Sequence, residues 1–378
     1  MGDYKIRLCL FLYGFHNGGV EKVFENYFSH MERSIFDLHA VVYLESDPKR
    51  EKLFKDMGFT VHKLSLYKAH EIKLRNVIEH WELFKNNKFD IVHCNMPENI
   101  LPILFAKIFR VKLRILHSHN DYNYIFHKSN WLIKEIYSKV IRFNANNANQ
   151  LIACGNVAAI TAFGKKSFNH GKVLILHNAI DVEKFSYNKE KREIIRSELG
   201  INDAIFVGHI GRFETDQKNQ EFLIKVFERA KKSIPNLKLI FIGDGKNKQA
   251  MEKAVSVLGY ADDVIFSGTV NNVYDYLQAI DIFCFPSRYE GLGIVAVEAQ
   301  AAGLPCILSD RVPKEVKICD DVTFLSIENS YDEWVNALIK YSNLRRVDTS
   351  DMIIKAGYEI NQVSEQLLNL YLTATDIP

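Results

Sequence analysis

Residues 288–298 read RYEGLGIVAVE and place Glu290 and Glu298 eight positions apart, with a Gly-Leu-Gly turn between them. The pattern predicts a loop that carries Glu290, followed by a helix that begins just after Gly293 and has Glu298 in its second turn. Backbone N–H groups at the start of a helix lack partners within the helix and lie at the positive end of its dipole. The stretch therefore predicts an anion site near Gly293 and Ile294, beside two carboxylates that can bind hydroxyl groups. This combination suits a sugar joined to a phosphate.

Apolar runs of strand length lie on both sides of this stretch, IDIFCFPS before it and LPCILSD after it. Similar runs recur along the chain with helical segments between them, among them IRLCLFLY, LHAVVYL, DIVHCNM, LRILHSH, QLIACG, AIFVGHIG, LKLIFIGDG and VIFSGTV. Strands that alternate with helices predict parallel pairing, and hence an α/β protein with doubly wound sheets. A chain of 378 residues is long enough for two such domains. Ligands of such sheets bind at the carboxyl ends of the strands.

The composition is that of a globular protein, with 47% hydrophobic and 25% charged residues and a net charge of +2. Such a small net charge does not call for a polyanion, so we expect no nucleic-acid partner. Six scattered cysteines without a CxxC pair indicate reduced thiols in a cytoplasmic protein. The first residues are interrupted by charge and glycine too early for a signal peptide, and no run of about 18 apolar residues predicts a membrane span.

Histidines follow two of the predicted strands of the first half. His117 and His119 alternate along one strand and would face the same side, but no third ligand lies at useful spacing. We therefore expect no metal site and no cofactor. His93 follows the preceding strand, and His93 and His117 are interpreted as packing or hydrogen-bonding residues.

Two further loops carry residues suited to phosphate. Gly18 and Gly19 follow the first strand and precede a helix, which is the phosphate-binding arrangement in outline, although a plain tight turn is the alternative. The spacing does not form GxGxxG, which argues against a dinucleotide-dependent oxidoreductase. Arg212 and Lys218 follow the AIFVGHIG strand. From composition alone, the favoured interpretation would be that these two cations lie on a solvated edge and have no functional role.

The run DIFCFPSRYEGLGIVAVEAQAAGLPCILSD closely resembles the donor-sugar motif of glycosyltransferase family 4. Its segment EAQAAGLPCILSD is most similar to the capsular and exopolysaccharide branch of the family. The resemblance covers nearly the whole chain and implies the GT-B fold, in which two Rossmann-like domains face each other across a cleft. It implies an acceptor domain over 1–182, a donor domain over 183–358 and a last helix, 359–378, that crosses back to the first domain. The family's Asn-Gly-Ile-Asp hinge is present, except that Ala179 replaces the glycine.

The resemblance implies a metal-independent, retaining hexosyl- or N-acetylhexosaminyltransferase. Its donor would be a nucleotide sugar, expected to be a UDP-sugar, and its acceptor a surface polysaccharide or lipid-linked glycan. His119 would contact the transferred sugar, Arg212 and Lys218 the diphosphate, Glu290 the sugar hydroxyls and Glu298 the ribose. The other donor-binding residues that it implies are Gly18, Gly19, Gly268, Val270, Gly291, Leu292, Gly293 and Ile294.

Two other classes of protein remain as alternatives. A nucleotide-sugar epimerase or a phosphorylase could use a similar scaffold, but neither needs Glu290 and Glu298 at this spacing, and nothing marks the pyridoxal phosphate lysine of a phosphorylase. A non-catalytic nucleotide-sugar-binding subunit would normally lack Arg212, Lys218 or one of the glutamates. All four residues are present.

Residues 101–143 combine eight cations and eight aromatic residues with only two acidic residues. One interpretation is a solvated helix face whose aromatic side chains belong to the core. The other is a surface that rests on anionic lipid, where each basic residue near the membrane contributes about 1 kcal/mol. On the second interpretation the protein would be peripheral on the inner face of the cell membrane. The cations proposed to face the lipid are Lys128, Lys134 and Lys139.

Overall fold

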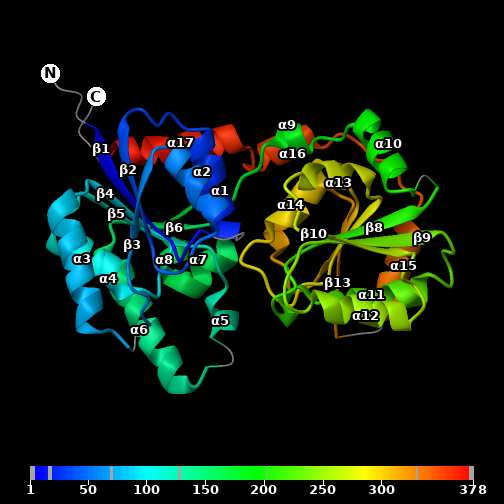
Figure 1. Cartoon of the computed structure of the whole chain (residues 1–378), viewed down its shortest axis with the longest axis horizontal. Coiled ribbons are helices and arrows are strands. Elements are labelled where there is room, and N and C mark those ends of the chain that lie inside the picture. Colours follow the sequence, from blue (N-terminus) through cyan, green and yellow to red (C-terminus); the bar gives the residue numbers. More distant parts are fainter. Residues whose placement is uncertain are drawn as a thin grey trace. The chain divides into compact units, whose positions relative to one another are not determined.

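The computed structural model describes residues 5–15, 19–68, 71–126, 129–201, 203–328 and 331–373. The chain forms two compact units, the first made of Met1–Ala179 and Ile360–Pro378, and the second of Ile180–Glu359. Each unit is a parallel sheet covered by helices (Figure 1). Gly18 and Lys128 lie outside the described residues.

The sheet of the first unit has seven parallel strands in the order β3-β2-β1-β4-β5-β6-β7. The chain fills one side of the sheet with β1 to β3 and then the other side with β4 to β7, so the strand order reverses between β1 and β4. The strands are β1 (Ile6–Phe11), β2 (Phe36–Val42), β3 (Phe59–Lys63), β4 (Ile91–Cys94), β5 (Leu113–Ser118), β6 (Gln150–Ala153) and β7 (Val173–Ile175).

Helices pack on both faces of this sheet because both faces of its strands are apolar. Leu8 and Leu10 of β1 belong to the core that α1 and α17 cover, whereas Phe11 turns to the other face and stacks on Phe84 of α3. Tyr371 of α17 is also fully buried in this core. The helices are α1 (Gly19–Ser29), α2 (Pro48–Asp56), α3 (Leu74–Asn87), α4 (Ile100–Ile108), α5 (Tyr122–Ile125), α6 (Trp131–Asn147), α7 (Asn156–Phe163), α8 (Lys165–Asn169) and α17 (Ile360–Thr373).

The sheet of the second unit has six parallel strands in the order β10-β9-β8-β11-β12-β13, and its strand order reverses between β8 and β11. The strands are β8 (Ile205–Ile210), β9 (Leu237–Ile242), β10 (Val264–Gly268), β11 (Ile282–Phe285), β12 (Cys306–Ser309) and β13 (Val322–Leu325). The α-helices are α9 (Val182–Phe185), α10 (Lys189–Glu198), α11 (Gln220–Ala230), α12 (Lys248–Val257), α13 (Val273–Ala279), α14 (Ile294–Ala301), α15 (Tyr331–Tyr341) and α16 (Ser350–Lys355). Two short 3₁₀ turns, η1 (Asp216–Lys218) and η2 (Lys314–Val316), complete the unit.

Helix α10 forms in a polar, charged segment to which the sequence analysis assigns no helix. Its inward face carries arginines rather than apolar residues, and these bind Asp281. Arg192 Nη2 lies 2.5 Å from Asp281 Oδ1, and Arg196 Nη1 lies 3.1 Å from Oδ2. Hydrophobic periodicity cannot reveal a helix that is held by ion pairs.

The two units divide at 179/180 and 359/360, whereas the family resemblance implies boundaries at 182/183 and 358/359. The chain enters the second unit at Ile180, whose N–H donates to the carbonyl of Tyr358 over 2.9 Å. Ala179 does not have a positive φ, so the hinge accepts alanine without strain.

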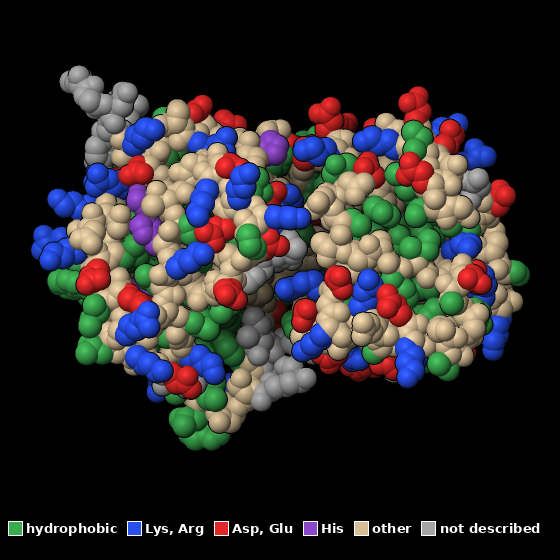
Figure 2. All heavy atoms as spheres, viewed as in Figure 1, with side chains coloured by type: hydrophobic (Ala, Val, Ile, Leu, Met, Phe, Trp, Pro, Cys, Tyr) green, Lys and Arg blue, Asp and Glu red, His purple; other side chains and the backbone are tan. Residues whose placement is uncertain are grey.

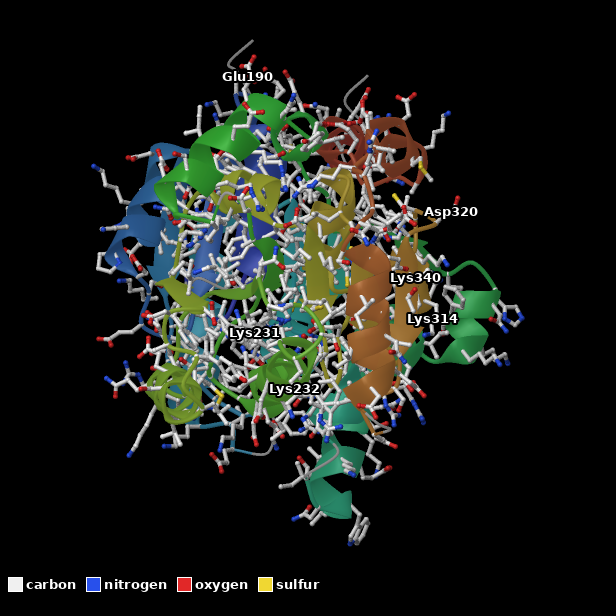
Figure 3. The ribbon with its side chains drawn as sticks, turned by 90° about the vertical axis from the view of Figure 1, so that its right-hand side faces the viewer. Glu190, Lys231, Lys232, Lys314, Asp320 and Lys340 are labelled. Carbon is white, nitrogen blue, oxygen red and sulfur yellow. The ribbon has the colours of Figure 1, made fainter. Side chains whose placement is uncertain are left out.

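The surface carries both signs of charge, interspersed over the visible face of each unit (Figure 2). In the second unit, Lys231 and Lys232 lie at the end of α11 and Lys340 lies on α15 (Figure 3). Within the part of the chain that is described, no helix is both long and apolar enough to cross a membrane. The six cysteines are buried free thiols.

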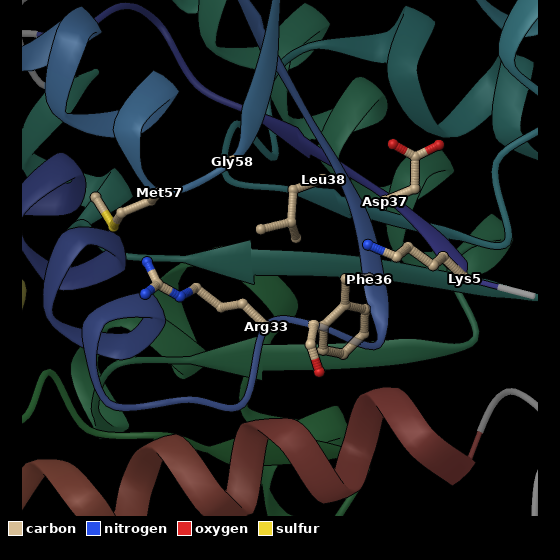
Figure 4. A pocket seen from close by; sticks show the side chains of 8 residues that line it. Lys5, Arg33, Phe36, Asp37, Leu38, Met57 and Gly58 are labelled. Atoms are coloured by element: carbon tan, nitrogen blue, oxygen red, sulfur yellow. The ribbon is translucent and has the colours of Figure 1, made fainter. Parts of the chain in front are cut away.

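A pocket of about 350 Å³ in the first unit is lined by Arg33, Phe36 and Asp37, among others (Figure 4). It lies at the amino ends of β1 and β2. Ligands of parallel sheets bind at the opposite edge, at the carboxyl ends of the strands.

Candidate functional site

The carboxyl edge of the second sheet brings Lys218 and Glu290 together at the point where the strand order reverses. Lys218 lies in the loop after β8, and Glu290 lies in the loop after β11, the neighbouring strand. Lys218 Nζ lies 2.7 Å from Glu290 Oε1, and the two side chains are 18% and 9% exposed. A crevice outside such a reversal point is the usual ligand site of a doubly wound sheet.

Direct hydrogen bonds join the two loops. The N–H of Arg288 donates to the carbonyl of Gln217 over 2.8 Å, and Gln217 Nε2 donates to the carbonyl of Tyr289 over 3.1 Å. Asn219 Nδ2 donates to the carbonyl of Pro286 over 3.1 Å. These bonds involve the residues on both sides of Lys218 and the residues that precede Glu290, and therefore hold the two loops together before any ligand binds.

Gly211 makes room for the Lys218 side chain. A Cβ added at position 211 would lie 2.7 Å from Lys218 Cγ, which is closer than real carbon contacts allow. The Lys218 ammonium also lies 4.7 Å from the centre of the Phe285 ring. The lysine is thus held between a bare backbone on one side and an aromatic ring on the other.

Arg212 follows β8 by two residues and is exposed. Its backbone carbonyl accepts a hydrogen bond from Gln220 Nε2 over 3.1 Å. Its guanidinium has no hydrogen-bond or ion-pair partner among the residues that the structure describes. The edge therefore offers one cation already matched by a carboxylate, and a second that is open to an anion.

Helix α14 begins as the sequence predicts. Gly293 immediately precedes it with φ 88°, a left-handed conformation that favours glycine, and Ile294 is its first residue. Leu292 is buried, and Glu298 is half-buried in the second turn of the helix. The amides at the start of α14 and the carboxylate of Glu290 thus lie on one loop and helix, as the sequence indicates.

Gly268 and Val270 lie at the carboxyl end of β10, which is two places away from β8 in the sheet. Gly268 ends β10 with φ 70°, and its carbonyl accepts a hydrogen bond from the N–H of Gly243 over 2.9 Å. Val270 is half-buried, and Gly291 is half-buried in the Glu290 loop. The residues assigned to the second unit therefore lie at the carboxyl ends of strands of one sheet or in the segments that follow these strands.

His209 is a buried polar residue beside this site that the sequence analysis did not single out. Its Nδ1 lies 3.0 Å from the carbonyl oxygen of Cys284 and must donate to it, which leaves Nε2 as a bare acceptor. Nε2 is buried without a partner among the described residues. Burial, opposed by the Cys284 bond and reinforced by Lys218, lowers the pKa of His209 to about 3. The signal available in the sequence was one histidine inside the apolar run AIFVGHIG.

His93, His117 and His119 of the first unit form a buried cluster. His93 Nδ1 lies 2.7 Å from the Tyr371 hydroxyl, and His93 Nε2 lies 3.1 Å from His117 Nδ1. His93 and His117 thus pack and hydrogen-bond, as the sequence indicates. His119 Nε2 lies 2.9 Å from Asn95 Oδ1, and burial lowers the pKa of His119 to about 4. No group of three metal-ligating side chains occurs among the described residues.

The predicted donor contacts of the first unit remain predictions. His119 is buried just after β5. Gly19 is the first residue of α1, and a Cβ added there would meet only open space, so no described contact requires glycine at 19. Gly18 lies outside the described residues.

Two family models match the chain and together cover most of it. The model described as Glycosyltransferase Family 4 matches residues 17–184, and the model described as Glycosyl transferases group 1 matches residues 191–360. The chain belongs to glycosyltransferase family 4. The carboxyl-edge residues of its second unit therefore belong to a glycosyltransferase with two Rossmann-like domains.

This family 4 glycosyltransferase is similar over its whole length to curated relatives. It is 28% identical to the putative glycosyltransferase EpsF of Bacillus subtilis (strain 168), over 100% of this chain and 99% of EpsF. It is 24% identical to the Escherichia coli UDP-Gal:alpha-D-GlcNAc-diphosphoundecaprenol alpha-1,3-galactosyltransferase, over 94% and 93%. The crystal structure of HepE from Anabaena in complex with UDP matches with a TM-score of 0.76 at 16% identity, over 97% of this chain and 100% of HepE. This last likeness supports the GT-B fold.

Proposed function

We propose that this glycosyltransferase transfers a hexosyl or N-acetylhexosaminyl group from a UDP-sugar to a lipid-linked or polysaccharide acceptor. The observation that carries the proposal is the Lys218–Glu290 pair at the strand-order reversal of the second sheet, with Arg212 in the same loop as Lys218 and without a side-chain partner among the described residues. A diphosphate needs cations, and a sugar needs carboxylates that accept from its hydroxyl groups. This edge supplies both within two loops.

Arg212 and Lys218 would stabilise the negative charge that develops on the departing nucleoside diphosphate. A guanidinium binds two phosphate oxygens in one plane, and an ammonium acts as a point charge. Because the neighbouring loops fix Lys218, little reorganisation is needed when the charge appears. The amide of Ile294 at the start of α14 would add a donor to the same anion.

Glu290 would hold hydroxyl groups of the transferred sugar. A carboxylate has about four acceptor positions, and Lys218 occupies one of them, so Glu290 can bind hydroxyls while it stays paired. Glu298 would bind the ribose hydroxyls, and backbone groups at Gly268 and Val270 would contact the base.

We further propose that transfer proceeds with retention and without a metal ion. The family resemblance implies attack from the face that the diphosphate leaves, with a phosphate oxygen taking the proton of the acceptor hydroxyl. In that step one carbon–oxygen bond to phosphate breaks, one to the acceptor forms, and the proton moves to the leaving diphosphate. Arg212 and Lys218 stabilise that leaving group.

The relatives support the choice of donor and acceptor. The name of the E. coli relative gives UDP-galactose as donor and a diphosphoundecaprenol-linked N-acetylglucosamine as acceptor, and the HepE structure contains UDP. A lipid-linked acceptor would place this protein at the cytoplasmic face of the membrane, in peripheral contact with anionic lipid.

Thermal-shift measurements with UDP, GDP, ADP and their sugars test the donor. A ligand that binds only the folded state raises the melting temperature by an amount set by its concentration relative to its dissociation constant. We expect UDP and one UDP-sugar to give the largest shifts. Equal responses to all nucleotides, or none, would contradict the choice of donor.

Turnover measurements separate an enzyme from a binding subunit. Arg212→Ala should lower the rate of sugar transfer by roughly one to three orders of magnitude. The matched control is Arg345→Ala, which removes an exposed arginine from the segment after α15. Transfer that is equally fast in both variants would remove Arg212 from the mechanism.

A further inference from the structure

The sheet of the first unit also has a strand-order reversal, and a carboxylate lies at its carboxyl edge. The reversal falls between β1 and β4. Tyr13 follows β1, Glu98 follows β4, and Tyr122 follows β5, the next strand in the sheet. These loops lie at the edge where ligands of doubly wound sheets bind.

Two tyrosine hydroxyls donate to the two oxygens of Glu98. The Tyr13 hydroxyl donates to Oε1, and the Tyr122 hydroxyl donates to Oε2 over 2.5 Å. The carbonyl of Tyr13 accepts from the N–H groups of Tyr43 and Leu44 over 2.9 and 2.7 Å, which fixes the backbone that carries its ring. The carboxylate is therefore held from two sides by rigid donors.

Both tyrosines keep their protons. Burial, followed by the charge of Glu98, raises the pKa of Tyr13 and of Tyr122 well above the ordinary value for a phenol. Burial and then Glu98 also raise the pKa of Tyr137 on α6. The surroundings of Glu98 thus contain phenols that donate hydrogen bonds.

Glu98 has no cationic partner in the described part of the chain. A carboxylate that is partly out of water and unpaired is costly unless hydrogen bonds satisfy its oxygens. It offers about four acceptor positions, and the two tyrosines occupy two. The two that remain suit a neutral ligand with several hydroxyl groups, whereas the negative charge disfavours phosphate.

The site is open to such a ligand. Tyr13 is 37% exposed, and Glu98 is half-buried. Tyr122 also lines a pocket of about 300 Å³, together with Phe126, Lys134 and Ser138, and neither Tyr13 nor Glu98 lines this pocket.

We propose that Glu98, held by Tyr13 and Tyr122, binds hydroxyl groups of the acceptor sugar. Two hydroxyls of one pyranose ring would donate to the free positions on Oε1 and Oε2, while the exposed ring of Tyr13 covers part of the sugar. This assignment rests on the proposed function and adds the acceptor residues that it leaves open. It concerns the first unit alone.

Saturation-transfer NMR with methyl N-acetyl-α-D-glucosaminide tests the binding directly, using the whole protein. We expect transfer from the wild type to the sugar, and a reduction of several fold in Glu98→Gln, which keeps the shape but loses the charge. The matched control is Glu79→Gln, a carboxylate of the same unit whose Oε2 accepts from the N–H of Ser65 over 2.8 Å. Absence of transfer in the wild type, or an equal loss in both variants, would overturn the assignment.

Kinetics with N-acetylglucosamine-diphosphoundecaprenol give a second, independent test. Glu98→Gln and Tyr13→Phe should raise the KM for this acceptor, the former by about tenfold, as expected when a hydrogen bond to a charged group is lost. UDP affinity by calorimetry should stay within twofold, because neither Glu98 nor Tyr13 is among the residues proposed to contact the donor. If both variants keep the wild-type KM for the acceptor and still bind UDP, this inference alone is overturned. If the wild-type protein does not bind UDP, the proposed function is contradicted. Tyr13→Phe keeps the test decisive if Glu98→Gln does not fold.

Discussion

The Lys218 ammonium lies 2.7 Å from Oε1 of Glu290, although the two residues are 72 positions apart in the sequence. The resemblance assigns them to different parts of the donor, the diphosphate and the sugar. Each side chain affects the other through this contact. Glu290 balances the charge of Lys218 in the free protein, and Lys218 fixes the position of one oxygen of Glu290. The two roles are therefore coupled.

A double-mutant cycle should reveal this coupling. Lys218→Ala should lower turnover by roughly one to three orders of magnitude, because a preorganised charge-stabilising donor is lost. Glu290→Ala should also lower kcat. Turnover in the double variant should fall by a smaller factor than the product of the two single-variant factors, because either single change already breaks the ion pair.

The matched control for this cycle is the Lys225–Glu221 pair on α11, which lies on the surface of the same unit. Exposed pairs contribute about 0–1 kcal/mol. Removing them should change neither kcat nor KM. Strict multiplicativity of the Lys218 and Glu290 effects would show that the ion pair has no part in catalysis.

Glu298→Ala should weaken nucleotide binding more than it slows chemistry. Ribose contacts are present equally in the ground state and the transition state, so their loss raises KM and leaves kcat nearly unchanged. Calorimetry with UDP should show about tenfold weaker binding. The control is Glu333→Ala, an exposed glutamate on α15. An unaltered UDP affinity in Glu298→Ala would make the ribose role wrong.

The sequence predicted the parts of the fold that depend on local pattern. The α/β class and the helix after Gly293 follow from apolar runs and from a glycine that takes φ 88°. Helix α10 was missed because Arg192 and Arg196 bind Asp281, a residue more than 80 positions away. Long-range ion pairs leave no periodic trace in a sequence.

The same limit applies to the candidate sites. Lys218 and Glu290 could each be selected from their place after a strand, but their contact depends on β8 and β11 being neighbours. His209 and Glu98 were missed because one histidine in an apolar strand, or one glutamate in a loop, has no distinctive spacing. Only the strand order shows which loops meet.

Activity should survive removal of divalent metal ions. The charge on the diphosphate would be matched by Arg212 and Lys218, and no group of three metal-ligating side chains occurs among the described residues. We expect at least half of the initial rate after treatment with EDTA. Complete loss of transfer, restored by magnesium or manganese but not by sodium, would make the metal-independent mechanism wrong.

Stability should fall as the pH drops below about 6.5, because buried histidines resist protonation. Burial lowers the pKa of His80 and His119 to about 4 and that of His209 to about 3. Below their ordinary pKa of about 6.5, the unfolded chain binds protons that the folded chain does not. The free energy of unfolding is thus fully retained above pH 6.5. For each buried histidine it falls by about 1.4 kcal/mol per pH unit between pH 6.5 and the pKa of that histidine in the folded protein.

Calorimetric unfolding at pH 7.5, 6.5 and 5.5 would measure this loss. The variant His209→Phe keeps a ring against Phe241 and Phe285 and removes one titrating group. It should take up about one proton fewer on unfolding at pH 5.5 than the wild type. Equal proton uptake by both proteins would contradict a neutral, buried His209.

The amino-terminal part of α6, which begins at Trp131, should bind anionic lipid. The structure divides the aromatic residues of this region: Phe105 and Tyr122 are core residues, whereas Trp131 is 77% exposed and Leu132 is 53% exposed. Figure 2 shows hydrophobic side chains at the surface of this end of the first unit, which α6 forms in Figure 1. Lys134 and Lys139 are exposed on the same helix. An amphipathic element of this kind suits the headgroup region of a membrane.

Flotation with vesicles would measure this binding. We expect recovery with vesicles that contain anionic lipid, weaker recovery at high salt, and weaker recovery after charge reversal at Lys134 and Lys139, because each cation near the surface contributes about 1 kcal/mol. Trp131→Ser should lower recovery at every salt concentration, since it removes the apolar part of the contact. Charge reversal at Lys232 and Lys340 in the second unit is the matched control and should have little effect. Equal recovery with neutral and anionic vesicles would make the electrostatic part wrong, and no recovery with either would favour an acceptor that is free in solution.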